Sequence, residues 1–303
     1  MNKSIRIGTR DSRLALWQAT LVQQLLEKYH HPSEIVKIKS EGDLNVKTPL
    51  YEMGVQGIFT RNLDAALLGN KIDVAVHSMK DVPVIPAKGI IQAAVLKRGA
   101  VRDLLAFKAS ADFLDDTQYI ATIATGSTRR KAQWLHRYPT HHIVDLRGNV
   151  NTRLRKLQEN NWDGAIFAAA GLERINLRPE SSVELEWMLP APAQGAIMVA
   201  CRKEDTFIKE VCQPLNDAET ALCTQVERDF LRTLSGGCST PISGYACIKS
   251  GILYFEGSIL SIDGKEKVEI KKQGRIDVVH QTGKEAAEDI LKAGGKEILE
   301  KLQ

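Results

Sequence analysis

The chain has 303 residues, of which 43% are hydrophobic and 26% charged, and its formal net charge is +4. This length favours two or three domains, and this composition belongs to a folded globular protein and excludes wholesale disorder. The longest uncharged apolar stretch near the middle, residues 164–172, falls well short of the roughly 20 residues of a membrane span, so we expect no transmembrane helix.

The first third of the chain alternates strand and helix patterns. We predict a strand at residues 5–7, a helix from Asp11 or Ser12, a strand at 35–38, a helix at 59–68 and a buried parallel strand at 73–79. Residues 41–57 form a glycine-containing loop without a clear period. This β-α-β-α-β order predicts an open α/β sheet with right-handed crossovers.

The middle of the chain repeats this scheme. We predict strands at residues 119–125, 143–146 and 164–169, and helices at 126–135, 150–159 and 172–175. Residues 189–201 are interpreted as a crossover back to the first unit. Two α/β units of this size usually face each other across a cleft, where small molecules bind.

The last third has a different pattern. We predict a helix at residues 217–234, antiparallel strands at 245–248, 252–260 and 265–272, and one amphipathic helix at 283–302. The predicted fold class is therefore α/β, with two α/β domains and a smaller α+β C-terminal domain. We place domain 1 at residues 1–98 plus about 196–214, domain 2 at 99–195 and domain 3 at 215–303.

Positive charge is concentrated in one window of the second unit. Residues 129–156 hold eight Lys and Arg residues and one acid, Asp145, so this window carries +7 and the rest of the chain −3. Arg129 and Arg130 fall at a predicted helix start, as does Arg153, where the helix dipole disfavours a cation by about 0.3–1 kcal/mol. A bound anion would supply the missing charge, and arginine favours carboxylates or phosphates. The alternatives are solvated surface arginines, or a nucleic-acid contact, for which the usual motifs are missing.

Lys80 and Asp81 follow the last strand of the first unit, and open α/β sheets bind ligands at the carboxyl ends of their strands. Asp81 is suited to accepting N–H hydrogen bonds and to stabilising a developing cation; a turn or capping aspartate is the alternative. His77 is interpreted as a packed strand residue, and no metal site is predicted, because no second ligand has suitable spacing. The histidine pairs at 30–31 and 141–142 are expected in exposed loops.

The cysteines indicate the compartment and one candidate for covalent chemistry. The five are Cys201, Cys212, Cys223, Cys238 and Cys247, without a Cys-x-x-Cys pair. This argues against a disulfide framework or a zinc ribbon and, with no secretory signal at the N-terminus, predicts a reducing cytoplasm. Cys238 follows two glycines, so its thiol is a candidate attachment point, with an inert loop cysteine as the alternative.

Five segments together resemble one family. They are residues 7–10 (IGTR), 14–19 (LALWQA), 75–83 (AVHSMKDVP), 146–154 (LRGNVNTRL) and 236–238 (GGC). In this order and spacing they resemble the porphobilinogen deaminases (hydroxymethylbilane synthases). These enzymes belong to tetrapyrrole biosynthesis, the pathway that leads to haem and other porphyrins. The resemblance runs from residue 5 to the C-terminus.

The resemblance implies a fold and a reaction. The fold comprises two domains like the lobes of periplasmic binding proteins and a smaller domain that carries the cofactor cysteine. A dipyrromethane cofactor, joined by a thioether to Cys238, is the primer to which four porphobilinogen molecules are added head to tail. Each addition releases ammonia, and hydrolysis then releases linear hydroxymethylbilane. The enzyme is a transferase.

The resemblance also implies the roles of individual residues. Asp81 matches the catalytic aspartate, and the matched cofactor contacts are Cys238, Lys80, Thr125, Ser127, Arg129, Arg130 and Gly195. The matched substrate contacts are Arg10, Ser12, Arg147, Arg153 and Arg174. We expect porphobilinogen as the substrate, a cytoplasmic monomer, and neither a metal nor a nucleic-acid or membrane partner.

The sequence departs from the family in the loop before residue 59. The family usually has lysines near the glycines of this loop, whereas Glu52 and Gln56 stand here. Lys47 or Arg61 is expected to substitute, and we expect a mobile lid. Two other classes of protein compete with the deaminase: a non-enzymatic two-lobed anion-binding protein, which needs no reactive cysteine, and a nucleic-acid binder, whose affinity falls steeply with salt.

Overall fold

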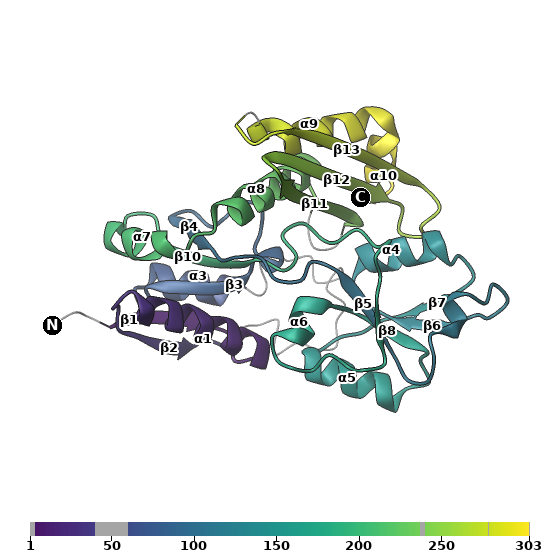
Figure 1. The fold of residues 1–303 in the computed structure, drawn as a ribbon, viewed down its shortest axis with the longest axis horizontal. Coiled ribbons are helices and arrows are strands. Elements are labelled where there is room, and N and C mark those ends of the chain that lie inside the picture. Colours follow the sequence, from purple (N-terminus) through teal and green to yellow (C-terminus); the bar gives the residue numbers. More distant parts are fainter. Residues whose placement is uncertain (1–3, 40–59, 237–239, 278, 303) are drawn as a thin grey trace. The chain divides into compact units, whose positions relative to one another are not determined.

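The computed structural model describes residues 4–39, 60–236, 240–277 and 279–302 (Figure 1). The described residues divide into two compact units. One contains those up to Gly99 together with Gln194–Leu222, and the other contains Ala100–Ala193 and those from Cys223 onward. Among the described helices, none has the length and apolar character that crossing a membrane requires.

The first unit is built on a five-stranded sheet in the order β2-β1-β3-β10-β4. Its strands are β1 (Ile5–Thr9), β2 (Ser33–Lys37), β3 (Val74–Ser78), β4 (Ile90–Val95) and β10 (Ile197–Arg202), and its longer helices are α1 (Arg13–Lys28), α3 (Arg61–Leu68) and α7 (Thr206–Cys212). β1, β2 and β3 are parallel, whereas β10 runs antiparallel between β3 and β4. The crossover predicted at residues 189–201 is therefore confirmed, and the sheet is mixed rather than parallel throughout.

Local sequence explains where the helices of this unit lie. Ser12 caps α1, as predicted, because its side chain accepts a hydrogen bond from the amide of Ala15. The apolar stripe of α1, with Ala19, Val22 and Leu26, packs on alternate residues of the strands and shares this core with α7. On the opposite side of β1, Gly8 leaves room for Ile72 and for Leu63 of α3.

The second unit contains a five-stranded sheet in the order β7-β6-β8-β5-β9. Its elements are β5 (Asp103–Phe107), β6 (Thr122–Ala124), α4 (Thr128–Arg137), β7 (His142–Val144), α5 (Val150–Glu159), β8 (Gly164–Ala168), α6 (Ala169–Glu173) and β9 (Ser182–Glu184). β6, β7 and β8 are parallel, and β5 runs antiparallel to β8 and β9. The order matches that of the first sheet, with β8 in the place of β3 and β5 in the place of β10.

Alternate strand residues of the second sheet serve two separate cores. Leu104 and Phe167 belong to the core that includes Leu157 of α5, whereas Leu105 and Ile166 belong to the core around Trp134 of α4. The two helices therefore cover opposite faces (Figure 1). This arrangement follows from the topology, because the chain moves in opposite directions along the sheet after β6 and after β7.

His141 corrects one expectation from the sequence. It is buried, not in an exposed loop, and its Nδ1 accepts a hydrogen bond from Trp134 Nε1 at 3.2 Å while its ring stacks on Tyr138. Burial lowers the pKa of His141. Its neighbour His142 is exposed, as predicted, but it begins strand β7 and does not lie in a loop.

The C-terminal residues form the small antiparallel sheet β11-β12-β13 predicted from the sequence. Its strands are β11 (Ile242–Lys249), β12 (Ile252–Leu260) and β13 (Lys267–Arg275), and the helices are α8 (Ala218–Thr233), α9 (Thr282–Ile290) and α10 (Lys296–Glu300). The single helix expected at 283–302 is wrong. Gly294 has φ +106°, which ends the regular helix and leaves a π-helical turn at Leu291–Gly295 between α9 and α10.

Candidate active site

In the first unit, the predicted site residues gather at one edge of the sheet. Arg10 and Ser12 follow the carboxyl end of β1, and Lys80 and Asp81 lie in a 3-10 turn, Met79–Asp81, directly after β3. Gly195 reaches the same edge because β10 is antiparallel and begins there, with Ile197 opposite Ser78. The structure thus brings these five residues to the sheet edge that binds ligands in open α/β proteins.

Two contacts hold the turn that carries Asp81. The amide of Met79 donates to the carbonyl of Ala196 at 3.0 Å. The side chain of Gln18, which is buried in α1, donates to Ser78 Oγ at 2.9 Å. Ala196 directly precedes β10 and Gln18 lies in α1, so these contacts tie the backbone at the half-buried Asp81 to the sheet and to the helix beside it.

Lys80 is oriented by a buried amide. Its Nζ donates to Gln194 Oε1 at 3.2 Å, and the carbonyl of Gln194 accepts a hydrogen bond from Arg98 Nε at 2.9 Å. Gly195 follows with φ +84°, a conformation that favours glycine, and its carbonyl accepts from the amide of Gly99 at 3.0 Å. The segment before β10 is therefore tied to the ammonium group of Lys80 and to the end of the β4 region.

His77 is buried in β3, two residues before the turn. Burial, with a smaller contribution from the positive charge of Arg10, lowers the pKa of His77 from 6.5 to about 4. The imidazole is therefore neutral at physiological pH, in agreement with a packed strand histidine. Within the described parts of the chain, no three His, Cys, Asp or Glu side chains lie close enough together to hold a metal ion.

We expect His77 alone to lower the free energy of unfolding by about 2 kcal/mol between pH 8 and pH 5. The unfolded chain protonates His77 near pH 6.5 and the folded chain only near pH 4, so the unfolded state binds more protons in this range. The stability is complete above pH 6.5 and is lost as the pH falls toward 4. Urea unfolding at a series of pH values measures the change.

A matched pair of variants isolates this effect. His77→Gln should flatten the dependence of unfolding free energy on pH, whereas His142→Gln, at an exposed position, should leave it unchanged. Equal slopes in the wild type and in His77→Gln would show that His77 does not titrate in this way.

In the second unit, Thr125 and Ser127 follow β6 at the corresponding edge. Ser127 caps α4 by accepting a hydrogen bond from the amide of Arg130, and Thr125 Oγ1 accepts one from the amide of Ser127. A side chain at Gly126 would place its Cβ 2.7 Å from the carbonyl oxygen of Leu146, so only glycine fits there. These contacts fix the start of α4, where backbone N–H groups and the helix dipole favour an anion.

Arg129 and Arg130 lie in the first turn of α4, and they are only 5% and 6% exposed. Asp103, fully buried at the start of β5, accepts hydrogen bonds from both. Arg129 Nη2 lies 2.7 Å from Asp103 Oδ2, and Arg130 Nη2 lies 2.7 Å from Asp103 Oδ1. The other Nη atoms donate to backbone carbonyls, of Leu189 from Arg129 and of Ile166 from Arg130.

The environment of Arg129 and Arg130 decides between two of the interpretations offered by the sequence, solvated surface arginines and arginines paired with an anion. Burial excludes the interpretation of Arg129 and Arg130 as solvated surface residues, and Asp103 supplies one anion at the helix start. Two guanidinium groups and one carboxylate leave a net charge of +1. Burial lowers the pKa of Arg129, Asp103 raises it, and the neighbouring Arg130 lowers it, which is the pattern of a partly compensated cation.

Three further arginines belong to the same edge or to its helices. Arg147 follows β7 and is 5% exposed, and burial lowers its pKa although Asp145 raises it. Burial also lowers the pKa of Arg174, after α6, to about 10. Arg153 is on α5, and its Nε donates to the carbonyl of Gly148 at 2.7 Å. Arg147 is buried and the other two are half-buried, so a nearby anion stabilises their charges more than it would at an exposed position.

The donors of the second unit suit the predicted dipyrromethane cofactor and its carboxylate side arms. The buried triad carries a net charge of +1, and Arg129 Nε makes no hydrogen bond within the part of the chain that the structure describes. The capped start of α4 adds backbone N–H groups. This set of planar cations and amides matches carboxylates better than it matches neutral groups.

Several predicted features lie outside the described residues. Cys238, the predicted attachment point, is one, and so are Glu52, Gln56 and Lys47 of the loop that was expected to be a lid. Arg61, the other proposed substitute for the missing lysines, is described and lies exposed at the start of α3.

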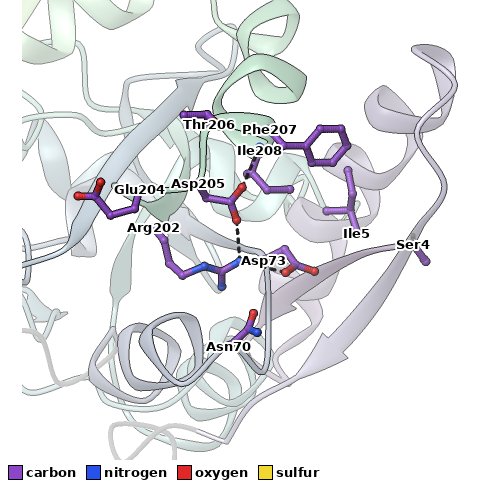
Figure 2. Close-up of a pocket in the computed structure, with 10 residues that line it drawn as sticks. All are labelled: Ser4, Ile5, Asn70, Asp73, Arg202, Glu204, Asp205, Thr206, Phe207 and Ile208. Atoms are coloured by element: carbon purple, nitrogen blue, oxygen red, sulfur yellow. Dashed lines mark hydrogen bonds and ion pairs between the residues drawn. The ribbon is translucent and has the colours of Figure 1, made fainter. Parts of the chain in front are cut away.

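A separate pocket of about 600 Å³ lies at the opposite edge of the first sheet (Figure 2). Three of its charged groups pair with one another: Arg202 Nη2 lies 2.7 Å from Asp205 Oδ2 and 3.1 Å from Asp73 Oδ1. Burial opposes ionisation of Asp73, but hydrogen bonds from Arg6 and Arg202 outweigh it and lower the pKa of that carboxyl group. None of the site residues predicted from the sequence lines this pocket.

Sequence reasoning missed three residues of the site edges: Asp103, Gln194 and Gln18. All three are buried polar side chains that hold a predicted site residue or its neighbour. Asp103 had a detectable signal, since it stands directly before the apolar run of residues 104–107, which reads as a strand.

Comparisons with known proteins show similarity to one family along nearly the whole chain. One family model, "Porphobilinogen deaminase, dipyromethane cofactor binding domain", matches residues 5–210, and a second, "Porphobilinogen deaminase, C-terminal domain", matches residues 221–292. A porphobilinogen deaminase of Chlorobium phaeobacteroides is 39% identical, with 100% of this chain and 99% of that protein covered. Another, of Syntrophotalea carbinolica, is 40% identical over 98% of this chain and 96% of its own. Among solved structures, an ABC transporter periplasmic substrate-binding protein from Coxiella burnetii shares 15% identity and a TM-score of 0.44, over 72% of this chain and 94% of that chain.

Proposed function

Because this chain belongs to the porphobilinogen deaminase family, we propose that Asp81, the arginines of the second unit and Cys238 carry the reaction of that family. The function itself is that of porphobilinogen deaminase, or hydroxymethylbilane synthase, a transferase of tetrapyrrole biosynthesis with a dipyrromethane cofactor. The observation that carries it is the match to curated relatives over the full length of both chains.

The reaction joins four porphobilinogen molecules head to tail, with loss of ammonia at each step, and ends in hydrolysis to linear hydroxymethylbilane. When bound through Cys238, the dipyrromethane cofactor supplies the free α-carbon to which the first porphobilinogen is joined. Loss of ammonia from porphobilinogen leaves a methylene-pyrrole cation. The protein must therefore stabilise a positive charge at the reacting ring and hold negative charges on its side arms.

Asp81 meets the first requirement. Its carboxylate accepts hydrogen bonds from pyrrole N–H groups and stabilises the cation that forms when ammonia leaves. The contacts that hold the Met79–Asp81 turn support this role, because a preorganised charge need not move during the reaction. Lys80, held by Gln194, binds a cofactor carboxylate.

The arginines meet the second requirement. Arg129 and Arg130, with Ser127, Thr125 and Gly195, hold the carboxylates of the cofactor. Arg147, Arg153 and Arg174, with Arg10 and Ser12, hold the acetate and propionate groups of the substrate. The low exposure of Arg147 and the lowered pKa values of Arg147 and Arg174 support this role, because both cations gain from a carboxylate partner.

Arg147→Leu and Arg153→Leu should each raise KM for porphobilinogen by about 10- to 100-fold, the loss of one charge-assisted hydrogen bond. Steady-state kinetics with porphobilinogen measures the change. Arg155→Leu is the matched control, since Arg155 is on the same helix α5 but is exposed and pairs with Glu159 at 3.6 Å. If the first two variants behave like Arg155→Leu, neither arginine binds substrate.

The proposed function is tested most directly by intact mass and product analysis of the purified chain. We expect an added mass equal to two pyrrole rings on the chain, and conversion of porphobilinogen to hydroxymethylbilane. A chain without such an adduct, which leaves porphobilinogen unchanged, would contradict the proposal.

We further propose that the chain works as a cytoplasmic monomer with three domains, at residues 1–98 plus about 196–214, 99–195 and 215–303. The three separate sheets support this division. Cys201, Cys212, Cys223 and Cys247 are free thiols, which is usual in a reducing compartment. Sedimentation of the purified chain tests the oligomeric state.

A further inference from the structure

Asp103 is a buried acid that the proposed mechanism does not use. It lies at the start of β5, and the register of β5 with β8 places it opposite Ala168, at the same sheet edge as the predicted cofactor contacts. Its side chain is fully buried. Burial of a carboxylate is costly unless the group is paired and hydrogen-bonded, so the contacts of Asp103 must offset the cost of its burial.

The contacts of Asp103 divide its two oxygens between two cations. Oδ2 accepts from Arg129 Nη2 at 2.7 Å, and Oδ1 accepts from Arg130 Nε at 3.0 Å and from Arg130 Nη2 at 2.7 Å. The two guanidinium planes are therefore fixed by one carboxylate, and the carbonyls of Leu189 and Ile166 fix their other ends. A mobile arginine side chain loses conformational entropy when it binds a ligand. Here the folded protein already restricts both side chains, so ligand binding costs less entropy.

The same contacts set the charge of the site. Arg129 and Arg130 alone would place +2 in a nearly solvent-free position at the start of α4, where the helix dipole is also positive. Asp103 reduces this to +1, which matches one carboxylate of a ligand. Arg129 Nε, which makes no hydrogen bond to any described residue, remains as a donor for that ligand.

We propose that Asp103 is a positioning residue for the cofactor, which holds Arg129 and Arg130 in the geometry that binds one of its carboxylates. The proposal rests on the proposed function, since it takes the two arginines as cofactor contacts. Asp103 does not touch the cofactor itself in the proposed arrangement. It acts through the two guanidinium groups.

The test compares the stability that the cofactor adds to the wild type and to variants. Each protein is made with Cys238 and again with Cys238→Ser, which cannot form the thioether, and thermal midpoints of the loaded and unloaded forms are measured. For Asp103→Asn, the difference between loaded and unloaded midpoints should be smaller than in the wild type by about 3 °C or more. Intact mass should show a lower loaded fraction after expression.

Two further variants separate positioning from a purely structural role. Asp103→Glu keeps the buried charge paired with both arginines, but its longer side chain displaces the two guanidiniums, so its midpoint difference should also shrink. This variant decides the question if Asp103→Asn does not fold. Asp163→Asn is the control, because Asp163 also accepts two 2.7 Å hydrogen bonds in this unit, from Tyr119 Oη and the amide of Thr122. It should lower both midpoints alike.

The outcomes are distinct. If the thermal midpoints of the loaded and unloaded forms fall by the same amount in both Asp103 variants, Asp103 has only a structural role and the inference is wrong. If the wild-type chain carries no adduct at Cys238, the proposed function fails, and this inference fails with it. A reduced midpoint difference in the Asp103 variants, with an unchanged difference in Asp163→Asn, supports the inference.

Discussion

Asp81→Asn should lower the turnover of porphobilinogen by about 100- to 1,000-fold while the chain folds and carries its cofactor. Asparagine keeps the shape of aspartate and one acceptor oxygen, but it lacks the negative charge that stabilises the methylene-pyrrole cation. The contacts that hold the turn, from the amide of Met79 to Ala196 and from the side chain of Gln18 to that of Ser78, do not involve the Asp81 carboxylate. The variant should therefore keep its structure.

Turnover is measured as consumption of porphobilinogen under saturating conditions, with intact mass to show that the adduct is present. Asp205→Asn is the matched control, since it removes a carboxylate of the first unit at the opposite sheet edge, where Asp205 caps α7. It should lower stability but leave turnover intact. A wild-type rate in Asp81→Asn would remove this aspartate from the mechanism.

Cys238→Ser should abolish the two-pyrrole adduct and lower porphobilinogen turnover by about 1,000-fold or more. The thioether makes the primer part of the protein, so each addition is an intramolecular step with a high effective concentration of the acceptor carbon. A serine hydroxyl is far less nucleophilic than a thiol and does not form the link. Mass spectrometry of the intact chain measures the adduct directly.

Cys247→Ser provides the comparison, because Cys247 is a half-buried thiol of β11 in the same unit. It should keep both the adduct and the activity. If Cys247→Ser loses the adduct while Cys238→Ser keeps it, the attachment point has been misplaced. If both variants keep it, the link is not through either sulfur.

The parallel strands of both α/β units and their helices other than α7 were predictable because their signals are local. Ser12, Ser127 and Asn149 cap three helices, and the helix predicted at 150–159 has the observed bounds. Each cap needs only a side chain and an amide two or three residues later, which a sequence displays directly. The site segments that follow β1, β3 and β6 were found for the same reason, as they sit where predicted strands end.

The antiparallel strands, and the polar contacts that depend on them, were harder to predict from the sequence. β4, β5 and β9 were not predicted. Because Asp103 is the first residue of β5, it was not identified as a residue of the site. Its role depends on the pairing of Asp103 with Ala168 and on two arginines of α4, contacts that join distant parts of the chain. The helix-dipole argument correctly required an anion near Arg129 and Arg130. It could not tell that the protein itself supplies one.

The place of β10 in the first sheet has a consequence for synthesis of the chain. β10 lies between β3 and β4, so this sheet stays incomplete until residues 197–202 have left the ribosome. Residues 100–193, which contain every strand of the second sheet, emerge earlier. The later-encoded sheet is thus the first that a nascent polypeptide can close, and the N-terminal strands must wait, partly exposed, for their missing neighbour.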